Sequence, residues 1–285
     1  MSRPLRVLHL IEDLGSGGAE RLLYVNLAAI DRTRFDGVVC HLYDRALHWR
    51  DPIQALGYQV ESLHLASIRD LPKGVVRLRR FLRRERFDVI HTHLYGANLV
   101  GRVAGRLAGV PVVCSLHNPD YEPAIHKDNP TLSPTKAAVL RWADQWTSAL
   151  AAPGFVAVSK YVKQSAVEYL GLAADRITVV YNPVDLDAFR STPDTLRAAA
   201  ALRRALDIPT AASVIACVAR LDPQKGLRYL IEALPSLVRR FPDVVAVLVG
   251  GGAPASRAAL EARAASLGVT KHVRFTGPQA DVRPY

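Results

Sequence analysis

The most specific chemical signal in the sequence is one turn that contains two cations. Arg220 lies near the end of an apolar run at residues 213–221, and Lys225 follows in an Asp-Pro-Gln-Lys-Gly turn whose last residue, Gly226, opens a helical pattern. An arginine can bind two phosphate oxygens at once, a lysine adds a compact charge, and the start of a helix adds a positive dipole end. These residue types indicate a diphosphate site, and a solvated turn without a ligand is the alternative.

Two glycine-rich loops form the second signal. Residues 15–20 read Gly-Ser-Gly-Gly-Ala-Glu after the first apolar run, and residues 250–252 are three glycines after a later one. Glycine lets a backbone approach a ligand closely, and free N–H groups at the start of a helix favour phosphate. The first loop has Glu20 where the dinucleotide pattern G-x-G-x-x-G has its third glycine, so a nicotinamide dinucleotide is disfavoured. A tight turn that binds nothing is the other alternative.

Histidines lie at the ends of two further apolar runs. His91 and His93 alternate in the run at residues 88–94, so they share one face of the expected strand. Two such histidines could bind a metal, but no carboxylate or cysteine nearby in the sequence completes a ligand set, so we expect hydrogen-bonded histidines and no metal. His117 ends the run at residues 112–118, at the strand edge where open α/β sheets bind ligands. It is therefore the better site candidate, with a structural histidine as the alternative.

The elements that must position these residues alternate between short Val/Ile/Leu runs and helical patterns. This alternation predicts an α/β protein with parallel sheets covered by helices. We expect strands at residues 6–14, 37–43, 60–65, 88–94, 112–118, 155–159, 177–182, 213–221, 244–250 and 273–277, and helices that include 226–241 and 254–267. A polar, then Ala/Arg-rich stretch marks the domain boundary. We therefore expect a first domain at residues 1–185, a linker at 186–210 and a partial second domain at 211–285, whose last strand has no covering helix after it.

The formal net charge of +11 favours an acidic partner, which can be nucleic acid, anionic lipid or a phosphorylated small substrate. Arginines concentrate from Arg77 to Arg86, around an apolar stripe that includes Leu78 and Leu82. A packed helix with a solvated basic face is the simplest interpretation, and contact with anionic lipid headgroups is the alternative. Nucleic acid is not expected, because the only aromatic side chain in this stretch, Phe81, is predicted to face the core.

Targeting and redox signals are weak. No apolar run approaches the roughly 20 residues that cross a bilayer, and acidic residues interrupt the first run, so no secretory signal is expected. Cys40, Cys114 and Cys217 lie far apart in strand-like runs, which predicts buried thiols in a reducing compartment. We expect a cytoplasmic protein, with peripheral attachment to the inner face of the membrane as an option.

Together these segments resemble the family 4 glycosyltransferases, in which two Rossmann-like domains clasp a nucleotide sugar. The matching pieces are GGAE at 17–20, DVIHTH at 88–93, SLHN at 115–118, VAVS at 156–159, YNPVD at 181–185 with Phe189, ARL at 219–221, KG at 225–226, VGG at 249–251 and VRFTG at 273–277. Each piece is a modest signal, but their order and spacing cover nearly the whole chain. The resemblance implies an α/β fold of the GT-B type, with two Rossmann-like domains of which the second is incomplete.

The resemblance also implies a role for each matching position. Arg220 and Lys225 would neutralise the donor diphosphate as it leaves, and His117 would contact the donor sugar near its reacting carbon. These three are the expected catalytic residues. The other expected substrate contacts are Gly17, Gly18, His93, Ser159, Asn182, Gly226 and Gly251. Family members transfer sugar with retention and usually without a metal, so no cofactor is expected beyond the nucleotide sugar as co-substrate.

Two departures from the family pattern bear on activity. The sequence has Asn182-Pro183 where Asn-Gly is commoner, a change that a turn tolerates. The family's E-x-x-x-x-x-x-x-E element, whose acids hold the donor sugar and ribose, is expected shortly after Gly277-Pro278, where the chain ends. We therefore expect a truncated glycosyltransferase of cell-envelope polysaccharide synthesis that is inactive or impaired alone, with a glycan, lipid-linked or small-molecule acceptor. The alternative is a non-catalytic acceptor-domain fragment or binding module that needs a second polypeptide.

Overall fold

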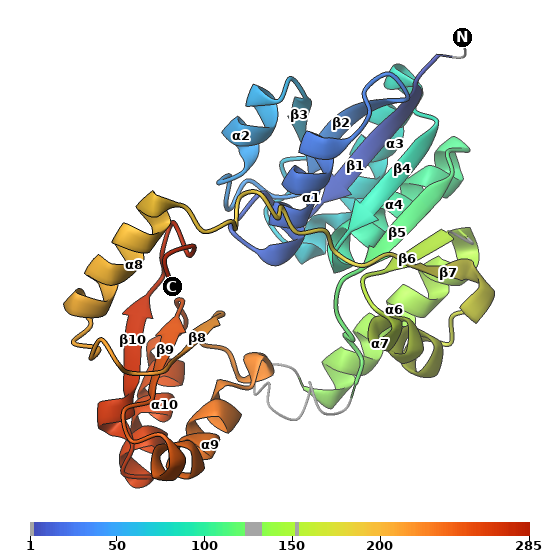
Figure 1. Cartoon of the computed structure of the whole chain (residues 1–285). Helices are drawn as coiled ribbons and strands as arrows, with labels where there is room; N and C mark the ends of the chain where they lie inside the picture. The colour runs from blue at the N-terminus through green and yellow to red at the C-terminus, as the bar shows by residue number, and fades with distance from the viewer. Residues whose placement is uncertain (1–2, 123–132, 152–153) are drawn as a thin grey trace. The chain divides into compact units, whose positions relative to one another are not determined.

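The computed structural model describes residues 3–122, 133–151 and 154–285. The chain divides into two compact units, Met1–Val184 and Asp185–Tyr285 (Figure 1). Each unit is built on a sheet of parallel strands with helices packed on it. The predicted α/β fold class is confirmed, and a strand forms in each of the ten apolar runs expected to contain one.

The first unit contains a seven-stranded sheet in the order β3-β2-β1-β4-β5-β6-β7. Its strands are β1 (Leu5–Ile11), β2 (Phe35–His41), β3 (Gln59–Ser62), β4 (Val89–His93), β5 (Val112–Leu116), β6 (Gly154–Ala157) and β7 (Ile177–Val179). Its α-helices are α1 (Gly18–Ala29), α2 (Arg50–Ala55), α3 (Leu71–Glu85), α4 (Tyr95–Ala108), α6 (Pro134–Ala151) and α7 (Lys160–Ser165). The order of the strands reverses between β1 and β4, and such a switch point is where ligands bind in sheets of this kind.

Helices α3, α4 and α6 pack in sequence, α3 against α4 and α4 against α6. Leu78 and Leu82 of α3 are buried in the core, while the arginines of that helix border them, so the predicted apolar stripe is confirmed. Helix α4 lies close to the sheet because Gly101 faces β4. A Cβ atom at Gly101 would lie 2.4 Å from Cγ2 of Thr92, a distance that leaves no room for a side chain.

The second unit contains a three-stranded parallel sheet in the order β10-β9-β8. Its elements are α8 (Pro193–Ala205), β8 (Val214–Val218), α9 (Leu227–Arg240), β9 (Val245–Val249), α10 (Pro254–Ser266) and β10 (Val273–Gly277). The segment predicted as a linker, residues 186–210, contains α8 and is part of this unit. Its end is packed in place, since Ile208 is buried against Val245 and Val247 of the central strand.

Within the described residues, no helix has both the length and the apolar character that a bilayer span requires. Cys40 and Cys114 are buried as free thiols, as predicted, whereas Cys217 is half-buried. Burial raises the pKa of the Cys40 thiol above its ordinary range. A thiol held in its protonated form is a poor nucleophile, so Cys40 serves as a packing residue of the core.

Candidate active site

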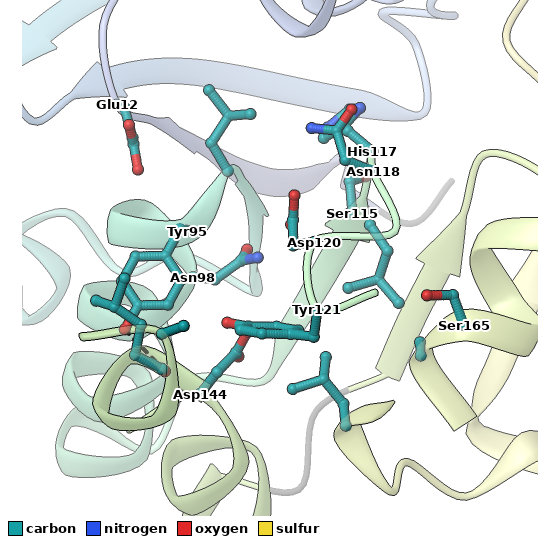
Figure 2. A pocket seen from close by; sticks show the side chains of 16 residues that line it. Glu12, Tyr95, Asn98, Ser115, His117, Asn118, Asp120, Tyr121, Asp144 and Ser165 are labelled. Carbon is teal, nitrogen blue, oxygen red and sulfur yellow. Dashed lines mark hydrogen bonds between the residues drawn. The ribbon is translucent and has the colours of Figure 1, made fainter. Parts of the chain in front are cut away.

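A pocket of about 270 Å³ opens at the carboxyl edge of the first sheet, beside the switch point between β1 and β4 (Figure 2). It is lined by residues that follow β1, β4 and β5, together with side chains of α6 and of the helical turn Ala166–Leu170. The polar lining residues are Glu12, Tyr95, Asn98, Ser115, His117, Asn118, Asp120, Tyr121, Asp144 and Ser165. Ligand pockets usually measure about 300 to 1,000 Å³, so this one suits a single ring.

The wall between β1 and β4 is fixed by a carboxylate. Glu12 follows β1, and its Oε1 accepts a hydrogen bond of 2.6 Å from the backbone N–H of Gly96 in the first turn of α4. Burial raises the pKa of Glu12, an effect that this hydrogen bond partly offsets. Leu94, the residue before α4, has φ +72° and ψ 165°, a conformation that favours glycine. Backbone strain of this kind persists where the surrounding structure enforces it, and often at ligand sites.

The floor of the pocket is a buried ion pair. Arg102 of α4 is fully buried, and its guanidinium pairs with the carboxylate of Asp144 from α6. The hydroxyl of Tyr121 donates a 2.7 Å hydrogen bond to the other oxygen of Asp144. Asp144 therefore joins α4, α6 and the segment after β5. Because Arg102 balances its charge, Asp144 adds little net charge to the pocket.

His117 is the only predicted site residue among the described residues that line this pocket. Its Nε2 lies 3.2 Å from Nδ1 of His93, which is 1% exposed and lies behind it in the sheet. Burial lowers the pKa of His117 to about 4, so its imidazole is neutral at neutral pH. His93 is predicted to contact a substrate, but it is buried next to His117, so it would influence a substrate only through His117.

The other predicted residues of the first unit lie outside the pocket as the described residues form it. Gly17 precedes α1, and a Cβ there would meet the carboxylate of Glu20 at 2.3 Å, while the position of Gly18 is open. The hydroxyl of Ser159 caps α7 by accepting the N–H of Val162 at 3.1 Å. Asn182 is exposed, beyond the end of β7. Their roles toward a substrate stay predictions.

In the second unit, the predicted diphosphate residues gather at the carboxyl edge of its sheet. The loops after β8 and β9 are joined by the N–H of Leu221, which donates to the carbonyl of Gly251 at 2.8 Å. Gly226 precedes α9 with φ +66°, and Lys225 before it is exposed. The side chain of Arg220 is 71% exposed and lies 3.6 Å from a carboxylate oxygen of Asp222. Both cations are thus accessible beside the start of a long helix.

Sequence reasoning missed most of the polar pocket. Glu12 ends the first apolar run and could have been recognised as a strand-end residue, as His117 was. Tyr95 and Asn98 begin a helix after such a strand, which is a weaker signal. Asp144 lies within a helix whose sequence gives no sign that this carboxylate reaches a pocket.

Each unit has a parallel sheet whose strand-end loops carry the candidate ligand-binding residues. This arrangement defines an α/β protein of the Rossmann-like GT-B class. The fold is similar to that of the Anabaena protein Alr3699/HepE in complex with UDP-glucose. The two structures match with a TM-score of 0.77 over 98% of this chain and 71% of that chain, at 22% sequence identity. The predicted fold is thereby confirmed.

Within that class, the family follows from the sequence match. Residues 16–188 match Glycosyltransferase Family 4, and residues 199–285 match Glycosyl transferases group 1. The chain therefore belongs to Glycosyltransferase Family 4, as the ordered motifs predicted.

Curated relatives with different acceptors match the chain. The UDP-Gal:alpha-D-GlcNAc-diphosphoundecaprenol alpha-1,3-galactosyltransferase of Escherichia coli is 27% identical over 71% of this chain. The 2-deoxystreptamine glucosyltransferase of Streptomyces kanamyceticus is 29% identical over 96% of it. The chain spans 50% of the length of the first relative and 68% of the length of the second.

Proposed function

We propose that the protein transfers a sugar from a nucleotide-sugar donor to a hydroxyl group of an acceptor bound in the pocket of the first unit. The bond between the acceptor oxygen and C1 of the sugar forms as the bond between C1 and the diphosphate oxygen breaks. The bonding electrons leave with the diphosphate, and the hydroxyl proton passes to the released diphosphate or to solvent. Retention at C1 is part of the proposal because the family resemblance implies it, and no residue is assigned as a nucleophile.

The observation that supports this function most strongly is the position of His117. It lines a ring-sized pocket at the switch point of a Rossmann-like sheet, and it matches the family position implied to contact the donor sugar. In the second unit, Arg220 and Lys225 are exposed at a strand-end loop, as residues that bind a diphosphate must be. Cations aimed at a leaving diphosphate stabilise charge that develops in the transition state.

The charges of the pocket indicate the acceptor class. Its ionisable carboxylates are Glu12, Asp120 and Asp144, and no lysine or arginine is among the described residues that line it. Asp120 is exposed as a whole residue, but its carboxyl lies within the pocket (Figure 2), where desolvation raises its pKa to about 7. A phosphorylated acceptor would be repelled here, whereas an amine-bearing or neutral polyol would be accepted. The name of the Streptomyces relative, which acts on 2-deoxystreptamine, agrees with that class.

The donor is tested first with uridine diphosphate sugars. The E. coli relative is named for UDP-Gal, and the Anabaena structure contains UDP-glucose. We propose isothermal titration of UDP-glucose, UDP-galactose and GDP-mannose into the full 285-residue chain, followed by the same titrations with 2-deoxystreptamine. Micromolar donor binding is the expected result. Absence of any donor binding, with acceptor binding intact, would favour the binding-module alternative.

The diphosphate assignment is tested by an Arg220→Ala, Lys225→Ala double variant. We expect at least a tenfold loss of UDP-glucose affinity, since each of the two substitutions removes a charge-assisted hydrogen bond to the diphosphate. The matched control is Arg239→Ala with Lys271→Ala, which removes two exposed cations from other parts of the same unit. Equal effects of the two double variants would show that only overall charge matters.

A second proposal is peripheral attachment to an anionic membrane on the cytoplasmic side. Its support is the surface of α3, where Arg80, Arg83 and Arg84 are exposed while the apolar stripe is buried. Basic side chains near a membrane surface each add about 1 kcal/mol of attraction to anionic lipid. Sedimentation with vesicles of phosphatidylglycerol and of phosphatidylcholine tests it: binding to the anionic vesicles alone is expected, and equal binding to both, or to neither, contradicts it.

A further inference from the structure

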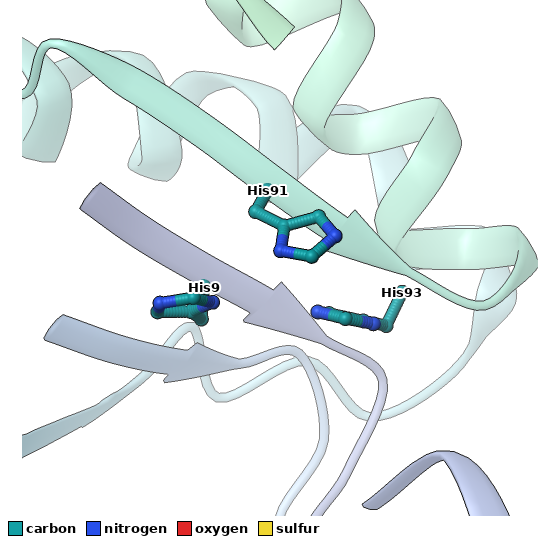
Figure 3. Close-up of side chains that lie close together, drawn as sticks. All are labelled: His9, His91 and His93. Carbon is teal, nitrogen blue, oxygen red and sulfur yellow. The ribbon is translucent and has the colours of Figure 1, made fainter. Parts of the chain in front are cut away.

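Three histidines converge in the core of the first unit, and none of them lines the pocket. His9 of β1 is the register partner of His91 of β4, and His93 lies two residues farther along β4 on the same face. One ring nitrogen from each lies within 4.8 Å of those of the other two (Figure 3). The sequence offers only His91 and His93 as a pair, and the pairing of β1 with β4 supplies the third imidazole.

Ring nitrogens of two of these histidines lack hydrogen-bond partners among the described residues. His9 is 6% exposed and His93 is 1% exposed, and both ring nitrogens of His9 and Nε2 of His93 have no hydrogen-bond partner within residues 3–122, 133–151 and 154–285. A buried polar atom without a partner costs free energy, so such atoms usually meet water or an ion. Unpartnered nitrogens on two of the three clustered rings indicate that something binds between them.

The remaining nitrogens are oriented from outside the cluster. Nε2 of His91 lies 2.8 Å from Oγ of Ser115, and Nδ1 of His93 lies 3.2 Å from Nε2 of His117. Metal-binding histidines typically have such an outer partner on the second ring nitrogen, which fixes the ring and leaves the other nitrogen for the metal. For His93, this contact leaves Nε2, which has no partner among the described residues, for a ligand.

We propose that His9, His91 and His93 form a binding site for a divalent transition metal, with Zn²⁺ as the expected ion. Three neutral imidazoles suit Zn²⁺, Co²⁺, Ni²⁺ or Cu²⁺ and do not suit Mg²⁺ or Ca²⁺, which prefer oxygen ligands. Zinc–nitrogen bonds of about 2.0–2.1 Å place ligand nitrogens about 3.4 Å apart in a tetrahedral site, so modest ring rotations would close the cluster.

Such an ion would have a structural role. It would join β1 to β4 at the switch point and would fix His93 with Nδ1–H toward His117. The ion itself would not touch a substrate, because none of the three histidines lines the pocket. An ordered water molecule is the competing occupant, since water can also satisfy buried nitrogens.

The test uses the full chain after treatment with a chelator and gel filtration. After Zn²⁺ is added back and the excess is removed by a second gel filtration, we expect about one equivalent of Zn²⁺ by mass spectrometry of metals. We also expect a rise in the unfolding temperature on adding Zn²⁺ and visible absorption bands on adding Co²⁺. His9→Phe and His91→Asn should each lose the bands and the temperature rise. The matched controls are His41→Gln, a buried histidine of β2 outside the cluster, and the exposed His64→Gln; both should bind as the natural chain does.

The outcomes separate an ion from water and from surface binding. Absence of bound Zn²⁺ and of Co²⁺ bands at micromolar metal in the natural chain would overturn the proposal in favour of a buried water. Metal binding that survives in His9→Phe and His91→Asn, or that is lost in His64→Gln, would place the metal on the surface and overturn it as well. The presence or absence of bound metal is measured first on the natural chain. The proposal can therefore fail even if none of the variants folds.

Discussion

Nδ1 of His93 lies 3.2 Å from Nε2 of His117, so an imidazole in the core orients the imidazole that lines the pocket. His93 is 1% exposed and cannot reach a ligand directly. A neutral ring has one N–H and one lone pair, so the nitrogen that His117 turns toward a ligand depends on which of the two rings donates. His93 is therefore a positioning residue, and its effect on a ligand passes through His117.

We predict that His93→Leu lowers the affinity for UDP-glucose about three- to tenfold, the value of one hydrogen bond. His93→Asn should restore part of the loss, because its amide can still pair with His117. Calorimetry in buffer with a chelator measures both affinities and keeps any metal out of the comparison. If the Leu and Asn variants were equally impaired, while both unfolded at the natural temperature, the positioning role would be excluded.

Asp144→Ala is predicted to destabilise the first unit by about 3–5 kcal/mol, because it leaves the guanidinium of Arg102 buried without its carboxylate. Denaturant unfolding, followed by the fluorescence of Trp142 and Trp146 on the same helix, measures the change. Lys73→Ala is the control in the same unit, since it breaks a pair with Asp70 in which the lysine side chain is 71% exposed, and it should change stability little. Similar losses in both variants would argue against the buried pair as an anchor of α6.

Gly101→Ala is predicted to destabilise the first unit by about 1–3 kcal/mol through overpacking, because the new methyl would meet Cγ2 of Thr92 at 2.4 Å. Alanine otherwise favours a helix over glycine, so a loss of stability would report the contact with β4. Gly154→Ala is the control: its nearest neighbour would lie 3.9 Å away, an ordinary contact. A more stable Gly101→Ala variant would mean that α4 can move away from the sheet.

The sequence predicted the strands and His117 because these depend on local patterns. Apolar runs followed by glycine or histidine mark strand ends, and parallel strands bring those ends to one edge. It did not predict that His9 meets His91, because that contact depends on β1 pairing with β4, which lies far along the chain. Asp144 was missed for a similar reason, because its burial depends on an ion pair with Arg102 of another helix. A helical pattern in the sequence does not show which polar residue will be buried against a neighbouring helix.

The pH dependence of acceptor binding follows from the carboxyls of the pocket. Burial raises the pKa of Glu12, and desolvation together with Asp144 and Glu12 raises that of Asp120 to about 7. Asp120 is therefore largely protonated in mild acid, and its negative charge is fully present only above its raised pKa, while the raised pKa of Glu12 acts in the same direction. The other charged group at the pocket, Asp144, is paired with Arg102, and His117 is neutral throughout this range.

Binding of 2-deoxystreptamine should accordingly strengthen as the pH rises through about 7, where Asp120 loses its proton. Calorimetry at three pH values measures this, with myo-inositol as a neutral probe whose binding should change little. Asp120→Asn should remove the change near pH 7, because this variant removes the titrating carboxyl. Equal pH profiles for the amine and the neutral polyol would contradict the proposal that the pocket carboxyls favour an amine-bearing acceptor over a neutral one.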